Sequence, residues 1–269
     1  MIDVHMHIHW FGYGPTKAVR HMDKLGVARS WLLGWESIGT GREEVHNTMT
    51  NRRTYTAWKK FPDRFIPFCS MDPLSRDPER QMRKWHELGF RGLGEQKLRL
   101  RVDNPDSVAL YRLAGEFGWP VLFHIDYWHP GVQFWYNHDL KAFEAVLRDC
   151  PEVTFVGHGP GFWRHVSGDA DKAPPGYPKG PVTAGGLLIR LLDGYPNLYC
   201  DLSAHSGLNA ISRDLEFGTR FLLKYSRRVM YGTDMFTSEH IEYLRSIELP
   251  KKVFDAITRK NALGLVPVD

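Results

Sequence analysis

Two histidines near the start of the chain, His5 and His7, are the first residues whose type and spacing indicate chemistry. They lie in the run IDVHMH at residues 2–7, which is typical of a short strand. Side chains two residues apart on a strand point to the same face, so the two imidazoles would project together. Such a pair forms half of a divalent-metal site. The alternative is that both are ordinary strand histidines, and further ligands elsewhere must decide between the two.

Four more ionisable residues each follow directly on an apolar stretch of strand length: Glu95, His124, His158 and Asp234. Histidines with a purely structural role would not be expected to lie so regularly at the ends of strands. The carboxyl ends of parallel strands in a barrel meet at one mouth, where these side chains would converge. Imidazole and carboxylate ligands suit zinc, and also manganese or iron where oxygen ligands dominate. The pattern therefore predicts a divalent-metal site, with zinc as the first choice and one or two ions per chain.

Eight strand-like segments are expected to position these residues, and helix-like segments alternate with them. The strands are predicted at residues 2–7, 30–34, 65–69, 90–95, 120–124, 153–158, 198–203 and 229–234. The helices are predicted at residues 15–25, 43–60, 78–88, 106–117, 140–148, 184–192, 215–224, 238–247 and 250–263. Because the strands are apolar throughout, they are typical of a parallel sheet that is covered on both faces.

This alternation predicts an α/β fold, namely a (β/α)8 TIM barrel that forms a single domain over residues 1–269. A doubly wound open sheet is the alternative. Its dinucleotide-binding form needs a GxGxxG fingerprint after the first strand, and the sequence has none there. Residues 159–183 are rich in proline and glycine, and we interpret them as a loop insertion rather than a linker between domains.

The motifs resemble those of the amidohydrolase superfamily. The run at residues 2–7, the residues His124 and His158, and the sequence YGTD at residues 231–234 carry the resemblance, together with KNALGL at residues 260–265. More narrowly, the chain is similar to a branch of small single-domain members that includes 2-pyrone-4,6-dicarboxylate lactonase and aminocarboxymuconate-semialdehyde decarboxylase. The resemblance spans nearly the whole chain and implies a metal-dependent enzyme on a TIM barrel.

The resemblance also implies a role for each residue of the predicted site. His5, His7 and His124 would be metal ligands. Asp234 would be a ligand that also takes the proton from the attacking water, although it could merely cap the helix that follows. His158 would hold a second metal or orient the water. Metal chemistry of this kind needs a carboxylate or imidazole beside the activated water to accept its proton.

Glu95 and Lys97 bear on which reaction the site performs. Some superfamily members hold a second metal with a glutamate at the end of the fourth strand, so Glu95 as a ligand favours a hydrolase. The alternative is that Glu95 pairs with Arg91, Lys97 or Arg99 at the rim of the barrel. An inward-pointing Lys97 would hold a substrate oxyanion or carboxylate.

Loops after the strands are expected to supply the walls of the substrate pocket. Trp128 belongs to a set of loop aromatics that would give the pocket a flat apolar part. Arg164, which follows two aromatic residues, is a candidate for contacting a substrate carboxylate, although such an arginine is more often on the surface.

The predicted function is therefore a metal-dependent hydrolase that attacks a lactone, ester or amide carbonyl of a small organic molecule. The first alternative is a metal-dependent, non-oxidative decarboxylase of an aromatic or unsaturated carboxylic acid. Two metals per chain with dependence on Glu95 would favour hydrolysis. Two further alternatives are a metal-dependent deoxyribonuclease of the same superfamily and a non-catalytic binding protein, which predicts a missing ligand; none is obviously missing.

Composition narrows the partners. The formal net charge of +4 over 269 residues, without a basic stripe, does not indicate a nucleic-acid partner. Three widely spaced cysteines are typical of reduced thiols, and neither a secretory signal nor an apolar run of membrane-spanning length is recognisable. We therefore expect a cytoplasmic protein with no membrane partner. A homodimer is one assembly that the resemblance allows.

Overall fold

The fold was analysed in a computed structural model, which describes residues 1–35, 49–126, 136–137, 139–173 and 176–268. Its strands are β1 (Ile2–Met6), β2 (Arg29–Leu33), β3 (Phe65–Phe68), β4 (Leu93–Gln96), β5 (Val121–His124), β6 (Phe155–His158), β7 (Leu198–Asp201) and β8 (Val229–Met230). All paired strands are parallel, in the sequential orders β1-β2-β3 and β4-β5-β6-β7-β8. The strand order is the one that the sequence predicts for a TIM barrel.

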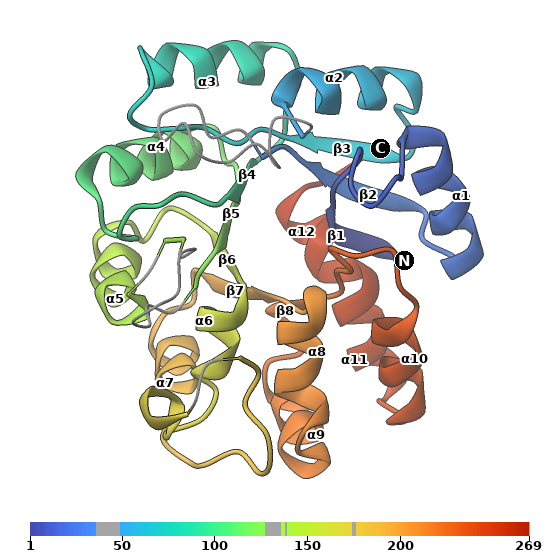
Figure 1. The fold of residues 1–269 in the computed structure, drawn as a ribbon, viewed down its shortest axis with the longest axis vertical. Helices are drawn as coiled ribbons and strands as arrows, with labels where there is room; N and C mark the ends of the chain where they lie inside the picture. The colour runs from blue at the N-terminus through green and yellow to red at the C-terminus, as the bar shows by residue number, and fades with distance from the viewer. Residues whose placement is uncertain (36–48, 127–135, 138, 174–175, 269) are drawn as a thin grey trace.

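Backbone hydrogen bonds join the two strand series into a closed ring. Between β3 and β4, the Cys69 amide donates to the carbonyl of Gly92 at 3.0 Å. Between β1 and β8, the Val4 amide donates to the carbonyl of Tyr231 at 3.0 Å. Figure 1 shows the strands around a common centre with the helices outside them. Closure removes the exposed sheet edges and confirms the (β/α)8 fold class.

The helices that cover the barrel are α1 (Pro15–Leu25), α2 (Asn51–Lys60), α3 (Pro78–Glu87), α4 (Pro105–Glu116), α5 (Leu140–Asp149), α6 (Pro160–Arg164), α7 (Leu187–Gly194), α8 (Ala204–Ser212), α9 (Leu215–Lys224), α10 (Glu239–Ser246), α11 (Lys251–Asp255) and α12 (Asn261–Leu265). Proline stands in the first turn of α1, α3, α4 and α6, where its missing N–H costs no hydrogen bond. None of the described helices is long and apolar enough to cross a membrane.

Four helical regions differ from the expectation, and one of them, α8, has no predicted counterpart. The second predicted helix, at residues 43–60, is described only from Asn51, because residues 36–48 lie outside the described part. The short helix α6 and a 3-10 turn at Ala170–Lys172 lie inside the predicted loop insertion. The last predicted helix is split, since a π-helical turn at Ala256–Lys260 separates α11 from α12.

Two hydrophobic clusters stabilise the barrel. The larger one lies between the strands and the outer helices. The smaller one joins inward side chains of six strands, among them Val4, Phe68, Leu122 and Met230, with residues of α12. Such a filled interior is expected of a barrel of eight strands, which encloses a packed core and no channel. The strands are therefore rigid supports for side chains at their carboxyl ends.

Candidate metal centre

A β-bulge in β1 directs His5 and His7 into the barrel. Ile2 and Val4 belong to the inner cluster, whereas Met6 belongs to the outer one. The pairing register of β1 with β2 shifts between Asp3 and Met6, so the inward phase moves from even to odd residues. The alternation that the sequence predicts for the two histidines is therefore present, but it begins after the bulge.

The Nε2 atoms of the two histidines lie 3.2 Å apart, with two carboxylates beside them. Glu95 Oε2 is 3.1 Å from Nε2 of His7 and 3.8 Å from Nε2 of His5. Asp234 Oδ1 is 3.4 Å from Nε2 of His5 and 3.7 Å from Nε2 of His7. Nε2 of His158 is 4.0 Å from Glu95 and 3.9 Å from Asp234. Five of the six predicted ligands thus converge from β1, β4, β6 and the segment after β8.

The groups have the spacing of two overlapping ligand sets. His5, Glu95 and His158 form one set, and His5, His7 and Asp234 form the other; within each set the candidate ligand atoms all lie within 4.8 Å of one another. All three imidazoles and Glu95 are buried. Nε2 of His158 is buried without a hydrogen-bond partner, which is costly unless something else binds it. Imidazole and carboxylate donors with one orphaned lone pair fit a divalent metal such as zinc.

The backbone conformation of Asp234 positions its carboxylate at the centre. Its amide donates to the carbonyl of His5 at 2.8 Å, and its φ of 56° is a left-handed conformation that aspartate tolerates better than most residues. The following helix α10 begins after Ser238, and its first turn has no side-chain cap. The Asp234 carboxylate therefore faces the two histidines, and it does not cap α10.

Asp201 and Ser203 hold the outer side of two imidazoles. Asp201 Oδ2 lies 2.6 Å from Nδ1 of His5. The Ser203 hydroxyl lies 2.7 Å from the same carboxylate oxygen and 2.8 Å from Nδ1 of His158. A Cβ on Gly232 would come within 2.3 Å of Asp201, so only glycine leaves room for this carboxylate. A hydrogen bond at Nδ1 fixes the tautomer and leaves Nε2 free to bind a metal.

The role of Asp201 was missed from the sequence, where its place at the end of β7 is equally consistent with a structural residue. Its sequence pattern nevertheless matches that of the predicted ligands Glu95 and Asp234, since it is a carboxylate at the end of an apolar strand. What the sequence could not indicate is the partner, because His5 faces Asp201 only after the bulge in β1.

His124 lies beside the centre but outside both ligand sets. It ends β5 in register with His158 on β6. Its Nδ1 lies 3.0 Å from Glu95 and its Nε2 lies 3.0 Å from Asp126. Both ring nitrogens thus contact carboxylates in this geometry, and the direct ligation that the resemblance implies stays a prediction.

The charges of the centre perturb its pKa values. Burial lowers the pKa of His5, but the carboxylates of Asp234 and Asp201 outweigh it and raise that pKa well above its ordinary value. Burial, reinforced by the positive charge of His5, lowers the pKa of His158 to about 3. Burial alone would raise the pKa of Glu95, yet Lys97 and the surrounding histidines hold it well below its usual range. The centre therefore combines ionised carboxylates with a neutral His158.

The three predicted substrate contacts have different outcomes. Lys97 follows β4 and places Nζ 4.0 Å from the centre of the Trp35 ring and 5.2 Å from that of Tyr136, next to the metal centre. Arg164 is buried and donates to the carbonyls of Ala170 and Ala173, so it holds the insertion together; its expected contact with a substrate carboxylate stays a prediction. Trp128 lies outside the described residues.

A family model described as amidohydrolase matches residues 2–268. The chain belongs to the amidohydrolase family. Among curated protein sequences, none matches this amidohydrolase significantly. Solved structures share its fold at low identity. A probable 2-pyrone-4,6-dicarboxylic acid hydrolase from Acinetobacter baumannii, with citric acid bound, is 16% identical over 98% of both chains, with a TM-score of 0.66.

Two other solved structures represent further chemistry on the same fold. An amidohydrolase from Burkholderia multivorans with bound zinc is 14% identical, with a TM-score of 0.66 over 100% of this chain and 99% of that one. A 2,6-dihydroxybenzoate decarboxylase from Rhizobium is 16% identical, with a TM-score of 0.55 over 98% and 97% of the two chains. At these identities the likeness concerns the fold of the amidohydrolase chain and leaves its reaction open.

Proposed function

We propose that this amidohydrolase is a zinc-dependent hydrolase of a lactone, ester or amide in a small organic substrate. The observation that carries the proposal is the convergence of three Nε2 atoms, from His5, His7 and His158, on the carboxylates of Glu95 and Asp234. These groups lie at the mouth formed by the carboxyl ends of the strands, where TIM-barrel enzymes place their active sites. A zinc ion held there would polarise a carbonyl and activate water near neutral pH.

In this proposal the chain's own residues divide the work. Asp234 takes the proton of the attacking water, because its carboxylate is ionised and a quarter exposed, with 23% of its side-chain surface accessible. His158 stays neutral, and through Nδ1 it is oriented by Ser203. Glu95 belongs to one ligand set and contacts His7 of the other, and His124 holds it in place by contacting its other oxygen.

The position of Lys97 favours a substrate that carries a negative charge. Its ammonium group lies beside Glu95 on the side of the centre where the rings of Trp35 and Tyr136 stand. A flat organic acid could place a carboxylate on Lys97 and its apolar face on Trp35. The hydrolase among the structural neighbours is named for a dicarboxylic acid, which is the same class of molecule.

The decarboxylase alternative is favoured by one specific feature. His5, His7 and Asp234 form a ligand set that does not need Glu95. A single metal in that set would leave Glu95 to interact with the histidines and with Lys97. The two reactions therefore make opposite predictions for the number of metals and for the importance of Glu95.

The deciding experiment combines metal analysis with a substrate screen. Purified wild-type protein is analysed for metal content and then assayed on panels of lactones, esters, amides and aryl carboxylates, beside Glu95→Gln and Asp234→Asn. We expect Asp234→Asn to lower turnover by about 10²–10⁴-fold with the circular dichroism spectrum unchanged, because the proton acceptor is lost. Hydrolysis with two metals that falls in Glu95→Gln supports the proposal.

Other outcomes contradict it. Carbon dioxide release with one metal, unchanged in Glu95→Gln, would assign the decarboxylase reaction instead. Full activity of Asp234→Asn on any substrate would overturn the assignment of the proton acceptor. Glu152→Gln, an exposed carboxylate after α5, serves as the matched control and should behave as wild type.

A further inference from the structure

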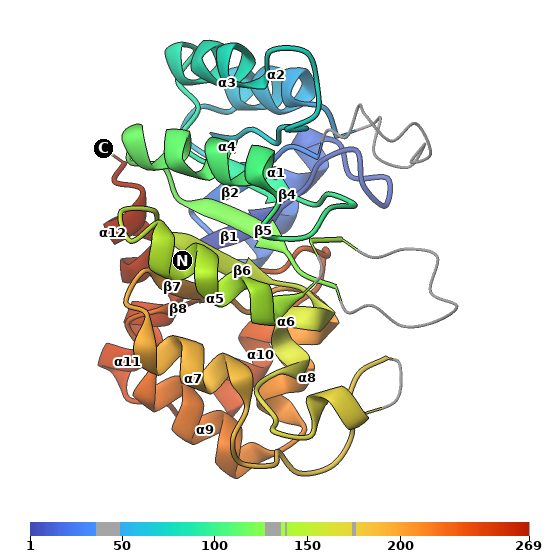
Figure 2. The ribbon, with the colours of Figure 1, turned by 90° about the vertical axis from the view of Figure 1, so that its left-hand side faces the viewer.

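A hollow of about 650 Å³ opens at the end of the barrel opposite to the metal centre. Its walls are the turn at Ser226 and Arg227, which precedes β8, and the helical segment at residues 252–265. Figure 2 shows α11 and α12 together on one side of the molecule, at the amino ends of the strands. The volume is within the range of about 300–1,000 Å³ that is typical of sites for small organic ligands.

Three cations line this hollow: Arg227 from the turn before β8, and Lys252 and Lys260 from the helical segment. Among the described residues, none of these three side chains makes a hydrogen bond or a close ion pair, although Lys260 is near enough to Asp255 to lower the pKa of that carboxyl. This differs from neighbouring surface cations, since Lys251 pairs with Asp255 and Lys224 pairs with Asp193. Unpaired like charges around one concavity repel one another and create a positive potential that an anion would relieve.

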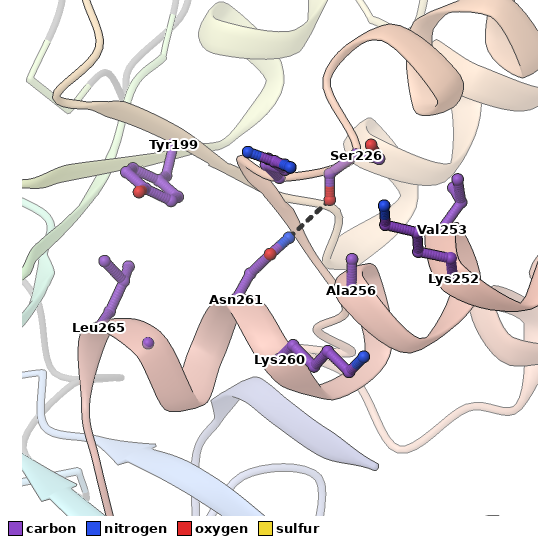
Figure 3. Close-up of a pocket in the computed structure, with 10 residues that line it drawn as sticks. Tyr199, Ser226, Lys252, Val253, Ala256, Lys260, Asn261 and Leu265 are labelled. Atoms are coloured by element: carbon purple, nitrogen blue, oxygen red, sulfur yellow. Dashed lines mark hydrogen bonds between the residues drawn. The ribbon is translucent and has the colours of Figure 1, made fainter.

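The other end of the hollow is apolar. Figure 3 shows the ring of Tyr199 and the side chain of Leu265 at one end, with Lys252 and Lys260 towards the other. Between them, the Asn261 amide group donates to the backbone carbonyls of Ser226 and Val229 at 2.8 and 2.7 Å. These bonds use the nitrogen of the side chain and leave its oxygen as an acceptor. The lining therefore changes from a flat apolar surface through polar groups to cations.

The local helix is irregular at the same place. Ala256–Lys260 form a π-helical turn, and Lys260 lies at its end. Single π-helical turns inside longer helices are rare, and many of those that occur lie at functional sites. None of the residues of the Ala256–Lys260 turn belongs to either candidate ligand set, although the Ile257 carbonyl accepts from the Tyr231 amide at 2.9 Å.

We propose that this hollow binds a phosphorylated small molecule of nucleotide size. The phosphate lies between Arg227, Lys252 and Lys260, and a planar ring packs against Tyr199. A dianionic phosphate matches three cations better than a single carboxylate does, and arginine can bind two of its oxygens at once. The site lies apart from the metal centre, so it does not depend on the reaction assigned there.

The test is isothermal titration calorimetry of the intact protein with adenosine monophosphate as the probe, at low ionic strength. We expect saturable binding with one site per chain, weakened about tenfold or more in Lys252→Ala/Lys260→Ala, because both ammonium groups contact the phosphate. Tyr199→Leu keeps an apolar side chain but removes the ring, and we expect it to weaken adenosine monophosphate while leaving inorganic phosphate unchanged.

Lys251→Ala is the matched control, because Lys251 is exposed on the same helix, pairs with Asp255 and does not line the hollow. It should bind the probe as wild type does. Equal weakening in Lys251→Ala and in the double variant would reveal general surface attraction and overturn the proposal. So would the absence of binding at millimolar probe, or binding that the double variant leaves unchanged. Because the readout is binding alone, these outcomes are independent of the proposed hydrolase activity.

Discussion

At the scale of single residues, the hydrogen bond between Asp201 and His5 ties the end of β7 to a proposed metal ligand on β1. Asp201 is fully buried, and the positive charge and hydrogen bond of His5 keep its pKa below the ordinary value although burial alone would raise it. Together with Ser203, it fixes which nitrogen of His5 and of His158 faces the centre. Such outer contacts commonly change metal affinity by about 10–100-fold when they are removed.

We therefore expect Asp201→Asn to weaken zinc binding by about 10–100-fold, because the amide can no longer act as a charged acceptor for His5. Ser203→Ala should have a smaller effect, since it leaves the Asp201 contact intact. Competition with a chromophoric chelator measures both constants. Asp193→Asn, a surface carboxylate on α7 that pairs with Lys224, is the control, and an Asp201→Asn protein with wild-type affinity would contradict the positioning role.

Several site residues could be predicted because their chemistry is visible in the residue type alone. His5, His7, Glu95, His158 and Asp234 follow apolar strands, and parallel strands bring their ends together. The burial of Arg164 could not be predicted, because its partners are backbone carbonyls whose position depends on how the loop folds. Likewise, the type and position of His124 do not reveal that Asp126 lies within hydrogen-bond distance of its ring.

At the scale of elements, periodicity predicted the strands better than the helices that follow them. The strands are defined by apolar runs, and even Pro67 is accommodated inside β3. The bulge in β1 has no sequence signal, since no glycine or proline marks it. The π-helical turn before α12 is equally hidden, because its apolar spacing resembles that of an ordinary helix.

The contact between α10 and α8 leads to a prediction about pH. His240 is buried on α10, and its Nε2 donates to the Ala204 carbonyl at 2.9 Å. Burial lowers its pKa below the ordinary value of 6.5. Below about pH 6.5 the unfolded chain therefore binds a proton at His240 that the folded chain does not bind. The contribution of the neutral, buried His240 to the free energy of unfolding is present above that pH and is lost as the pH falls through it.

We expect His240→Gln to lose less unfolding free energy than wild type between about pH 8 and about pH 5.5. The difference should be on the order of 1 kcal/mol, since one unit of pKa corresponds to about 1.4 kcal/mol. Urea unfolding at both pH values measures it. Identical curves for His240→Gln and wild type would contradict the prediction.

At the scale of the whole molecule, the barrel and its metal centre should stabilise each other. The centre brings three buried imidazoles and the buried Glu95 together with the partly exposed Asp234, and Nε2 of His158 lacks a partner there. A metal that binds only the folded chain adds stability of about 2.7 kcal/mol when its free concentration is 100 times the dissociation constant. The fold class could be predicted from the alternation of strands and helices. The coupling between metal binding and stability could not, because it depends on the positions of individual side-chain atoms.

Removing the metal with a chelator is therefore expected to lower Tm by several degrees, and adding zinc back should restore it. Scanning calorimetry measures both changes. The Asp234→Asn protein should show a smaller response, because one ligand is weakened. Equal melting temperatures for treated and untreated wild-type protein of confirmed metal content would show that the centre does not support the fold.

The seam between β1 and β8 has a consequence for how the protein matures. Val4 on β1 donates to Tyr231 after β8, and Asp234 donates to His5 across the same seam. During synthesis, His5 and His7 leave the ribosome more than two hundred residues before Asp234 does. The ligand set that contains all three can assemble only after the last strand has paired with the first. In the proposed function, a metal would therefore bind this set only in chains that have completed the ring.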